Sequence, residues 1–228
     1  CAARGAAANP APGANMSLEI VPFTLGPAQT NAYLIADPET AEAAVIDPSW
    51  DGHLILAEAQ KRGWRIGHLW YTHAHFDHIG GAAAIADALN PLPLVALHPE
   101  DHVLWRAGGG GRMFGLAIDP GPEPSIDFIH GQILRLGSNI FEVRYTPGHT
   151  PGHVVLYCAG ESVCFCGDLI FAHSVGRTDL PGGNWDTLVR SIREQIYSLP
   201  ENTRLLSGHG PETTVGEEKV SNPFVQEF

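Results

Sequence analysis

The chain has 228 residues, of which 44% are hydrophobic and 17% are charged. These values are typical of a globular protein, long enough for one well-cored domain and short for two. Its formal net charge of −12 works against binding to nucleic-acid phosphates or an anionic membrane surface, and no apolar run approaches the length needed to span a bilayer.

Residues 1–15, CAARGAAANPAPGAN, are rich in Ala, Pro and Gly and carry one charge. Such a composition buries too little apolar surface to order itself, and it lacks the apolar region of a signal peptide. We predict a disordered leader or an expression-derived segment before a natural start at Met16, with residues 16–228 forming a single domain. A mature chain that begins at Cys1 as a lipidated anchor is the alternative interpretation.

From Met16 onward, short β-rich runs punctuated by Gly, Pro and Asp alternate with helical patterns. Strands are predicted at 18–26, 30–37, 41–48, 67–74, 93–101, 131–137, 139–147, 153–160, 162–172 and 203–210. Helices are predicted at 53–63, 79–90 and 184–200. Short strands in both halves, with helices between them, predict an α+β fold in which two mixed sheets pack face to face with helices outside.

The cysteines form no disulfide framework, which fits a reducing compartment, and we expect a cytoplasmic protein. They are Cys1, Cys158, Cys164 and Cys166. The last two alternate along a strand-like run, so both are predicted to point to the same face as small buried hydrophobic side chains.

Residues 108–111 are four consecutive glycines between segments that contain aromatic residues. Glycine leaves the backbone free to move, which is compatible with a mobile flap over a site. A flexible surface loop is the other interpretation, and the sequence leaves both open.

A dense group of histidines follows the strand predicted at 67–74. In WYTHAHFDHIGG, residues 70–81, three histidines and an aspartate fall within six residues: His73, His75, Asp77 and His78. Imidazole nitrogens and carboxylate oxygens are ligands that suit zinc, iron or manganese. The H-x-H-x-D-H spacing offers two chelating pairs, more than one ion takes from a single loop. The remaining ligands are therefore expected at the ends of other strands.

Three further side chains of this kind each follow an apolar strand, in a turn bent by Gly or Pro. They are His149 in TPGHTPGH, Asp168 in CFCGDLIF and His209 in LLSGHGPE. Glycine lets the backbone bend sharply there, so that the side chains can reach a shared point. Together with the dense motif they predict a bound metal site. We interpret His153 as a residue that orients a ligand through a hydrogen bond, and His173 as either facing the substrate or lying in a plain loop.

These motifs resemble the metallo-β-lactamase superfamily and, within it, the short single-domain glyoxalase II-like hydrolases of bacteria. The resemblance is carried, in family order from Thr72 to Phe224, by THAHFDHIGG, TPGHTPGH, GDLIFAHSVGRTDLPGG, SGHGPETTVGEEK and NPF. The H-x-H-x-D-H motif is specific for the superfamily, and SVGRTDLPGG narrows it to the glyoxalase II-like hydrolases. The resemblance implies an αββα four-layer sandwich with the metals at one edge between the sheets.

By position, the resemblance implies a centre with two divalent metal ions. By this resemblance, one ion is expected to be bound by His73, His75 and His149. The other is expected to be bound by Asp77, His78 and His209. Asp168 matches the position of the carboxylate that bridges both ions. Zinc is the first expectation for the metal, with iron or manganese as alternatives, because sites of this type accept several ions.

The reaction implied by this resemblance is hydrolysis of a thioester, of the hydroxyacylglutathione hydrolase type. Two neighbouring divalent ions lower the pKa of a bridging water, and the resulting hydroxide attacks a carbonyl that one ion polarises. Asp77 and Asp168 are the implied catalytic residues, which hold the hydroxide between the metals, and Asp77 is also a candidate acceptor for its proton. A thiolate leaves readily, so a thioester needs less acid assistance than an amide.

The expected partner is a small-molecule thioester, with no nucleic acid and no membrane. Larger glyoxalase II enzymes bind glutathione with the help of a C-terminal helical domain, whereas only about nineteen residues follow His209 here. Arg177 is interpreted either as a contact for a substrate carboxylate or as a partner of Asp179, which stands where those enzymes place an aromatic residue. His173 and Lys219 are the other candidate substrate-binding residues. These departures favour a smaller or broader thioester than one carried by glutathione.

Three alternatives remain: a mono-iron persulfide dioxygenase of the same superfamily, a lactonase, and a non-catalytic module that keeps a metal for stability. Phe76 inside the histidine cluster and the SVGRTDLPGG motif favour the hydrolase over the dioxygenase. Structural zinc sites are closed and rich in cysteine, unlike the ligand set implied here. Metal count and oxygen consumption distinguish the dioxygenase, and turnover that is lost in Asp168→Ala distinguishes the non-catalytic module.

Overall fold

The computed structural model describes residues 18–225, so the predictions for residues 1–15 and for Cys1 lie outside the described residues. The first sheet has six strands in sequence order. They are β1 (Glu19–Leu25), β2 (Thr30–Asp37), β3 (Glu42–Ile46), β4 (Arg65–Trp70), β5 (Leu94–Leu97) and β6 (Ile126–Asp127). β1, β2 and β3 are antiparallel neighbours, whereas β3, β4, β5 and β6 run parallel.

The second sheet also has six strands, in the order β14-β13-β10-β9-β8-β7. They are β7 (Ile133–Leu136), β8 (Asn139–Tyr145), β9 (Val154–Cys158), β10 (Val163–Gly167), β13 (Arg204–Ser207) and β14 (Thr213–Thr214). Only the β10–β13 pair is parallel among these described strands. A separate two-stranded hairpin consists of β11 (Ile170–Phe171) and β12 (Ser174–Val175).

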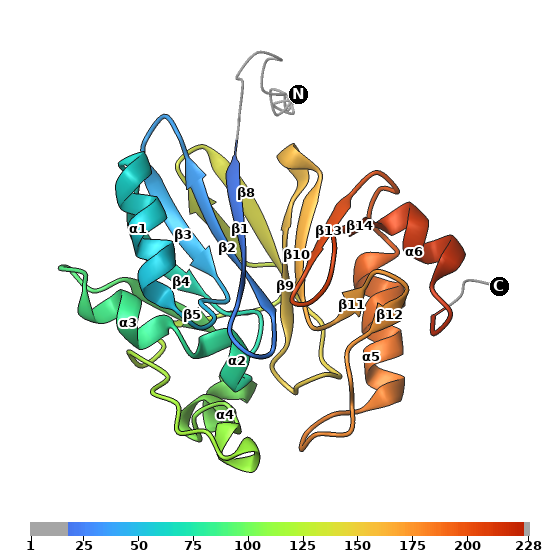
Figure 1. The fold of residues 1–228 in the computed structure, drawn as a ribbon. Coiled ribbons are helices and arrows are strands. Elements are labelled where there is room, and N and C mark those ends of the chain that lie inside the picture. The colour runs from blue at the N-terminus through green and yellow to red at the C-terminus, as the bar shows by residue number, and fades with distance from the viewer. Residues whose placement is uncertain (1–17, 226–228) are drawn as a thin grey trace, which may run out of the picture.

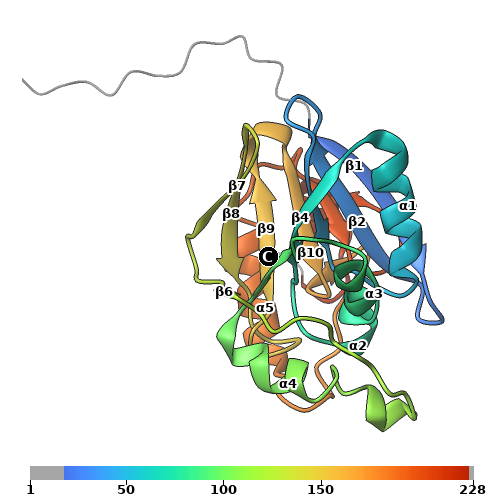
Figure 2. The same cartoon turned by 90° about the vertical axis from the view of Figure 1, so that its left-hand side faces the viewer.

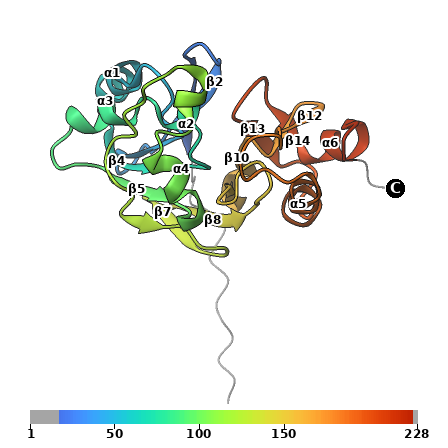
Figure 3. The same cartoon turned by 90° about the horizontal axis from the view of Figure 1, so that it is seen from below.

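Helices cover the outer faces of both sheets (Figure 1). Those beside the first sheet are α1 (Gly52–Arg62), α2 (Phe76–Ile79) and α3 (Ala82–Asp87). Those beside the second are α5 (Trp185–Ser191), a π-helix (Ile192–Ile196) and α6 (Val215–Ser221). The view from below shows these two groups of helices on opposite sides of the strands (Figure 3). The four layers confirm the predicted sandwich of two mixed sheets between helices.

Shorter helical segments complete the described chain. They are η1 (Pro99–Asp101), α4 (His102–Arg106), η2 (Gly111–Phe114) and η3 (Ala159–Glu161). α4 lies at the same end of the molecule as α2 in two perpendicular views (Figures 1 and 2). No helix among residues 18–225 is long and apolar enough to cross a membrane.

The side chains of β2 contribute to the hydrophobic clusters on both faces of the first sheet. Successive side chains of a strand point to opposite faces of its sheet. Leu34 and Ala36 pack in the cluster that includes α1 residues, whereas Tyr33 and Ile35 pack against the second sheet. β2 is therefore buried on both faces, which explains its continuous apolar run. On the far side, Cys164 and Cys166 are buried together in the cluster beneath α5, as predicted.

Two helical predictions need correction. The helix predicted at 79–90 is instead two short helices, α2 and α3, separated by Gly80 and Gly81. A Cβ atom on Gly81 would lie 1.8 Å from the carbonyl oxygen of Ser49, so the chain comes too close to the loop after β3 for a side chain there. The helix predicted at 184–200 is α-helical only in α5 and continues as the π-helix.

Asp37 joins the two sheets through hydrogen bonds at the ends of their strands. Its Oδ2 accepts from Ser138 N at 2.8 Å, from Ser138 Oγ at 2.7 Å and from Asn139 Nδ2 at 3.3 Å. Its Oδ1 accepts from the backbone of Glu39 and Thr40, both at 3.0 Å. Burial raises the pKa of Asp37, but the donors of Ser138, Thr40 and Glu39 outweigh burial and lower this pKa to about 2.

We expect Asp37→Ala to lower the free energy of unfolding by about 2–3 kcal/mol near neutral pH, because several donors lose their acceptor. The folded-state pKa lies below the ordinary aspartate value of about 3.9, so this contribution is present above pH 4 and is lost as the pH falls toward 2. Urea unfolding at a series of pH values measures the effect. Glu39→Ala is the control, because Glu39 is an exposed neighbour of Asp37. An equal effect of both variants would contradict the stabilising role of the Asp37 carboxylate.

Candidate metal centre

The predicted ligand motif lies in the turn that follows β4. His73 and His75 belong to the loop after the strand, and Asp77 and His78 belong to the first turns of α2. All four are buried, with exposed fractions of 0%, 7%, 8% and 0% in that order. The carboxyl ends of parallel strands commonly hold ligand sites in sheets of this kind.

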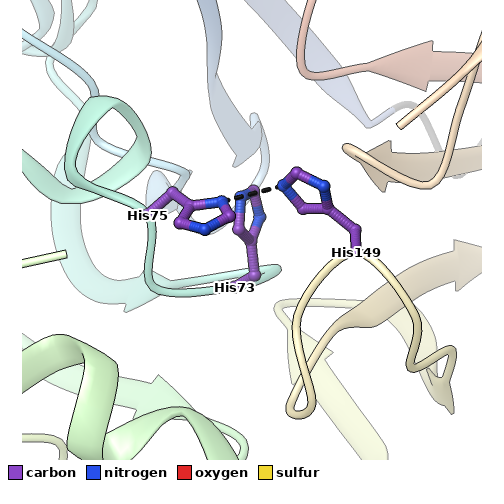
Figure 4. A group of neighbouring side chains, drawn as sticks. All are labelled: His73, His75 and His149. Atoms are coloured by element: carbon purple, nitrogen blue, oxygen red, sulfur yellow. Dashed lines mark hydrogen bonds between the residues drawn. The ribbon is translucent and has the colours of Figure 1, made fainter. Parts of the chain in front are cut away.

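The first ligand group consists of three histidines whose ring nitrogens lie within 4.8 Å of one another: His73, His75 and His149. Figure 4 shows His73 and His75 pointing from one loop toward His149 on another. His75 Nδ1 lies 2.8 Å from His149 Nε2. Three converging imidazole nitrogens match the number and type of protein ligands that one transition-metal ion takes.

The second ligand group consists of Asp77, His78 and His209, whose ligand atoms also lie within 4.8 Å of one another. Asp168 stands between the groups. Its Oδ1 lies 3.3 Å from His78 Nε2, and its Oδ2 lies 3.5 Å from both His149 Nε2 and His209 Nε2. The structure therefore brings together all seven residues predicted as ligands, with Asp168 in contact with both groups.

Three atoms of these residues are buried without a hydrogen-bond partner: His73 Nε2, His78 Nε2 and Asp168 Oδ1. Buried polar atoms nearly always have a partner, so unpartnered ones require an explanation. A divalent cation accepts lone pairs from nitrogen and oxygen alike, and all three atoms belong to predicted ligands. The residues present therefore fit a metal centre.

Hydrogen bonds on the far side of each ring decide which nitrogen faces the metal centre. His149 Nδ1 donates to the carbonyl oxygen of Arg177 at 2.7 Å, and His78 Nδ1 donates to Asp47 Oδ2 at 3.0 Å. Thr72 Oγ1 donates to Asp47 Oδ2 at 2.7 Å, which leaves it to accept from His73 Nδ1 at 3.0 Å. In the neutral form of each ring, Nε2 is therefore the nitrogen whose lone pair is available to a metal.

The three-histidine group is held neutral. Burial, together with the neighbouring imidazoles, lowers the pKa of His73 well below its ordinary value. Burial and His149 lower the pKa of His75 to about 3, and burial also lowers the pKa of His149. Neutral rings carry the lone pairs that metal binding needs.

The carboxylates remain ionised despite their burial. Burial raises the pKa of Asp168, but His78 and His209 outweigh it and hold this pKa well below its ordinary value. For Asp77, burial is likewise outweighed by His78, His209 and Thr30, which lower the pKa to about 2. Two negative charges are thus fixed beside the converging nitrogens.

Three supporting residues had no place in the sequence-based prediction. Asp47 orients Thr72 and His78, and Thr30 Oγ1 donates to Asp77 Oδ2 at 2.8 Å. The third is Asp101, which accepts hydrogen bonds from Ala74, Thr150 and Gly152. Asp47 follows β3, the parallel neighbour of β4, so its place at the end of an adjacent strand was the available signal.

Asp101 connects the two loops that carry the three-histidine group. Its Oδ2 accepts from Ala74 N at 3.0 Å and from Thr150 Oγ1 at 2.8 Å, and its Oδ1 accepts from Gly152 N at 2.7 Å. Ala74 lies between His73 and His75. Asp101 is fully buried, so its carboxylate sets the spacing of these loops without contact with solvent.

His153 supports the bridging carboxylate through the backbone. Its Nε2 accepts from Asp168 N at 3.1 Å, so its other nitrogen, Nδ1, donates to Thr146 Oγ1 at 2.9 Å. Burial lowers the pKa of His153 well below its ordinary value, which keeps Nε2 available as an acceptor. Its hydrogen bond reaches a ligand residue, in agreement with its predicted orienting role.

The residues predicted to bind substrate have contacts with other parts of the protein. Arg177 pairs bidentately with Asp179, at 2.7 Å for both Nε–Oδ1 and Nη2–Oδ2. His173 contacts α6: its Nδ1 lies 3.1 Å from Ser221 Oγ. Lys219 is part of α6 itself. Of the two interpretations of the Arg177 side chain, the structure contains the pair with Asp179, while its backbone carbonyl orients His149.

The glycine run at 108–111 packs against the metal-binding loop. Phe76 N donates to Gly109 O at 3.0 Å, and a Cβ atom on Gly109 would lie 2.3 Å from Phe76 N. Gly109 also has a φ of +64°, which side chains rarely allow. The run therefore packs closely on the backbone at Phe76 through Gly109, which precedes η2, and is not a free-standing loop.

We expect Gly109→Ala to destabilise the fold by about 1–3 kcal/mol and to weaken metal binding, because the clash displaces the backbone next to His75. Gly115→Ala is a matched control: its φ is +75°, but a Cβ atom there would have no neighbour within 4 Å. Chelator competition on both variants measures the affinity. Equal affinities in the two variants would show that the contact with Phe76 does not position the ligands.

A cavity of about 680 Å³ lies elsewhere, at the amino ends of β3, β4 and β5. Trp64, Leu89 and Leu92 are among its lining residues. The ligand groups follow the carboxyl end of β4. This cavity therefore lies at the opposite end of the strands from the metal centre.

A sandwich of two sheets with histidine and carboxylate groups at the strand ends is the arrangement of a superfamily of metallo-hydrolases. The metallo-beta-lactamase superfamily description matches residues 25–209, and the chain belongs to that superfamily. Hydroxyacylglutathione hydrolase GloC of Haemophilus influenzae is 34% identical over 219 residues, which cover 92% of this chain and 98% of that protein.

Two solved structures extend the comparison. BLEG-1 B3 metallo-beta-lactamase has a TM-score of 0.85 at 37% identity and covers 92% of this chain and 100% of its own. TTHA1623 in a di-iron-bound form has a TM-score of 0.81 at 42% identity, covering 90% of this chain and 100% of its own. The fold thus accommodates a pair of metal ions in a similar protein.

Proposed function

We propose that the protein is a dinuclear metal-dependent hydrolase that cleaves thioesters, of the glyoxalase II type. The observation that carries this proposal is the position of Asp168, whose carboxylate lies within 3.5 Å of ligand nitrogens in both groups. A carboxylate in that position can contact an ion in each ligand group at the same time. The similarity to a hydroxyacylglutathione hydrolase supports the thioester assignment.

Two divalent ions bound there would supply Lewis-acid activation of water and polarisation of the substrate carbonyl. His73, His75 and His149 would hold one ion, and Asp77, His78 and His209 the other. Asp168 would contact both. In this proposal Asp77 also accepts a proton from the attacking water, because its carboxylate stays ionised and Thr30 fixes one of its oxygens.

Zinc is the proposed metal, with iron or manganese as alternatives. Histidine and carboxylate ligands suit all three, and a di-iron form is known for the similar TTHA1623. A cytoplasmic location is part of the proposal, supported by three free buried cysteines: Cys158, Cys164 and Cys166.

The test is hydrolysis of S-lactoylglutathione by zinc-loaded protein, with oxygen consumption on glutathione persulfide measured in parallel after iron loading. The proposal predicts release of glutathione from the thioester and no oxygen uptake. Oxygen uptake without thioester hydrolysis would replace the hydrolase with the mono-iron persulfide dioxygenase. Acid formation from a lactone, which releases no thiol when its ring opens, is followed separately with a pH indicator and checks the lactonase.

A further inference from the structure

An apolar surface adjoins the ligand His75. A small hollow of about 40 Å³ is lined by His75 together with Leu104, Met113, Phe114, Leu180 and Pro181. We call the four residues Leu104, Met113, Phe114 and Leu180 the apolar wall. A metal ligand and the apolar wall therefore share one hollow.

The apolar wall continues away from the metal centre. A larger hollow, of about 460 Å³, shares Leu104 and Met113 with the small one and extends over Leu116 and Ile118. A chain that begins at His75 would thus find apolar contacts on both sides of Met113. Ligand pockets commonly combine such apolar lining with a few polar groups at one end.

Two side chains of the apolar wall are exposed to solvent and are not part of the hydrophobic core. Met113 is 61% exposed and Phe114 is 51% exposed. The ring of Phe114 packs on Phe76, with ring centroids 5.1 Å apart, so it is fixed beside the metal-binding loop. Grouped exposed apolar side chains mark binding surfaces.

Two arginines near this surface are paired with carboxylates. Arg177 forms the bidentate pair with Asp179. Arg106, on the edge of the larger hollow, pairs with Glu123 at 3.0 Å. Arg112 also lines the larger hollow and has no ion pair among the described residues, but no arginine lines the small hollow beside His75. A group that binds next to His75 therefore meets the apolar wall and no arginine.

We propose that the apolar wall binds the acyl chain of the substrate, so that the protein favours thioesters of aliphatic acids over those of short polar acids such as lactate. The scissile carbonyl must reach the ligand groups beside His75, and the carbon chain attached to it then lies along Met113 and Phe114. The reaction in this statement rests on the proposed function. The binding preference does not, and it can be measured by itself.

The test uses ketone analogues in which a methylene replaces the thioester sulfur, with acyl chains from acetyl to octanoyl and an N-acetylcysteamine-like tail. Calorimetry on zinc-loaded protein measures their dissociation constants. We expect binding to tighten by about fourfold for each added methylene, the value for burial of a CH₂ group. Met113→Ser combined with Phe114→Ser should flatten this dependence, and Leu180→Ser should weaken it independently.

Ile129→Ser is the matched control, because Ile129 is 61% exposed like Met113 but does not line either hollow. The dependence on chain length should persist in this variant. Dissociation constants that do not change with chain length in the unmodified protein, or a dependence that survives in the Met113/Phe114 variant, would overturn the proposal.

Turnover of the corresponding thioesters separates this inference from the proposed function. Chain-length-dependent binding without any thioester hydrolysis would reject the thioesterase and leave the acyl-binding wall standing. Hydrolysis with no chain-length dependence in binding would support the thioesterase and reject the acyl-binding wall.

Discussion

Asp168→Ala is expected to lower hydrolysis by about a thousandfold or more and to leave the protein unable to hold a full complement of metal. The variant removes the one carboxylate that lies within 3.5 Å of His149, His78 and His209 nitrogens. Its loss would also remove a negative charge that compensates the two proposed cations. Metal content by elemental analysis and turnover by thiol release are the measurements.

Asp87→Ala is the control for this change, because Asp87 is exposed at the end of α3. Asp168→Asn tests charge separately from shape, since an amide keeps the oxygen but not the ionised group. If Asp168→Ala bound metal and turned over substrate like the control, the bridging role would be wrong.

Asp101→Ala is expected to have the second largest effect. The change leaves three buried donors, Ala74 N, Thr150 Oγ1 and Gly152 N, without their acceptor. We expect a loss of about 3 kcal/mol in the free energy of unfolding. We also expect metal affinity to fall by about 10–100-fold, the range found when residues that orient ligands are removed. Urea unfolding of the metal-free protein and chelator competition measure the two effects.

Glu100→Ala is the control, since Glu100 is the exposed neighbour of Asp101 and its partner Tyr145 keeps a hydrogen bond to Pro151 O at 2.8 Å. A fold that is weakened with unchanged metal affinity would show that Asp101 supports the sheet ends without setting the ligand geometry.

The longer strands were predictable from the sequence because their burial follows from local patterns. The two-residue strands β6, β12 and β14 were not predicted, and the strand predicted at 162–172 is instead β10 followed by β11, which belongs to the separate hairpin. β2 reads as a continuous apolar run because both of its faces are covered. α6 was missed for the opposite reason. Its buried anchor is a carboxylate: Glu218 accepts from Thr213 Oγ1 at 2.7 Å and from Asn222 Nδ2 at 2.8 Å. Apolar periodicity cannot detect a helix that packs through hydrogen bonds.

The convergence of the seven candidate ligands was predictable because their spacing and their positions after strands are both visible in the sequence. Asp101 was not, because its partners lie 27, 49 and 51 residues away and it shares no motif with them. The sequence did not decide whether Arg177 pairs with Asp179 or contacts a substrate carboxylate, because an arginine can pair with either carboxylate. Only the placement of both side chains distinguishes them.

The number of metal ions that activity requires is the decisive test of a dinuclear centre. Metal-free protein is titrated with Zn²⁺ while bound ions are counted by native mass spectrometry and thioester hydrolysis is followed. We expect one ion for each ligand group, two in all, with hydrolysis reaching its maximum only when the second has bound. Full hydrolysis with a single ion per chain, or saturation at one ion, would contradict a dinuclear centre.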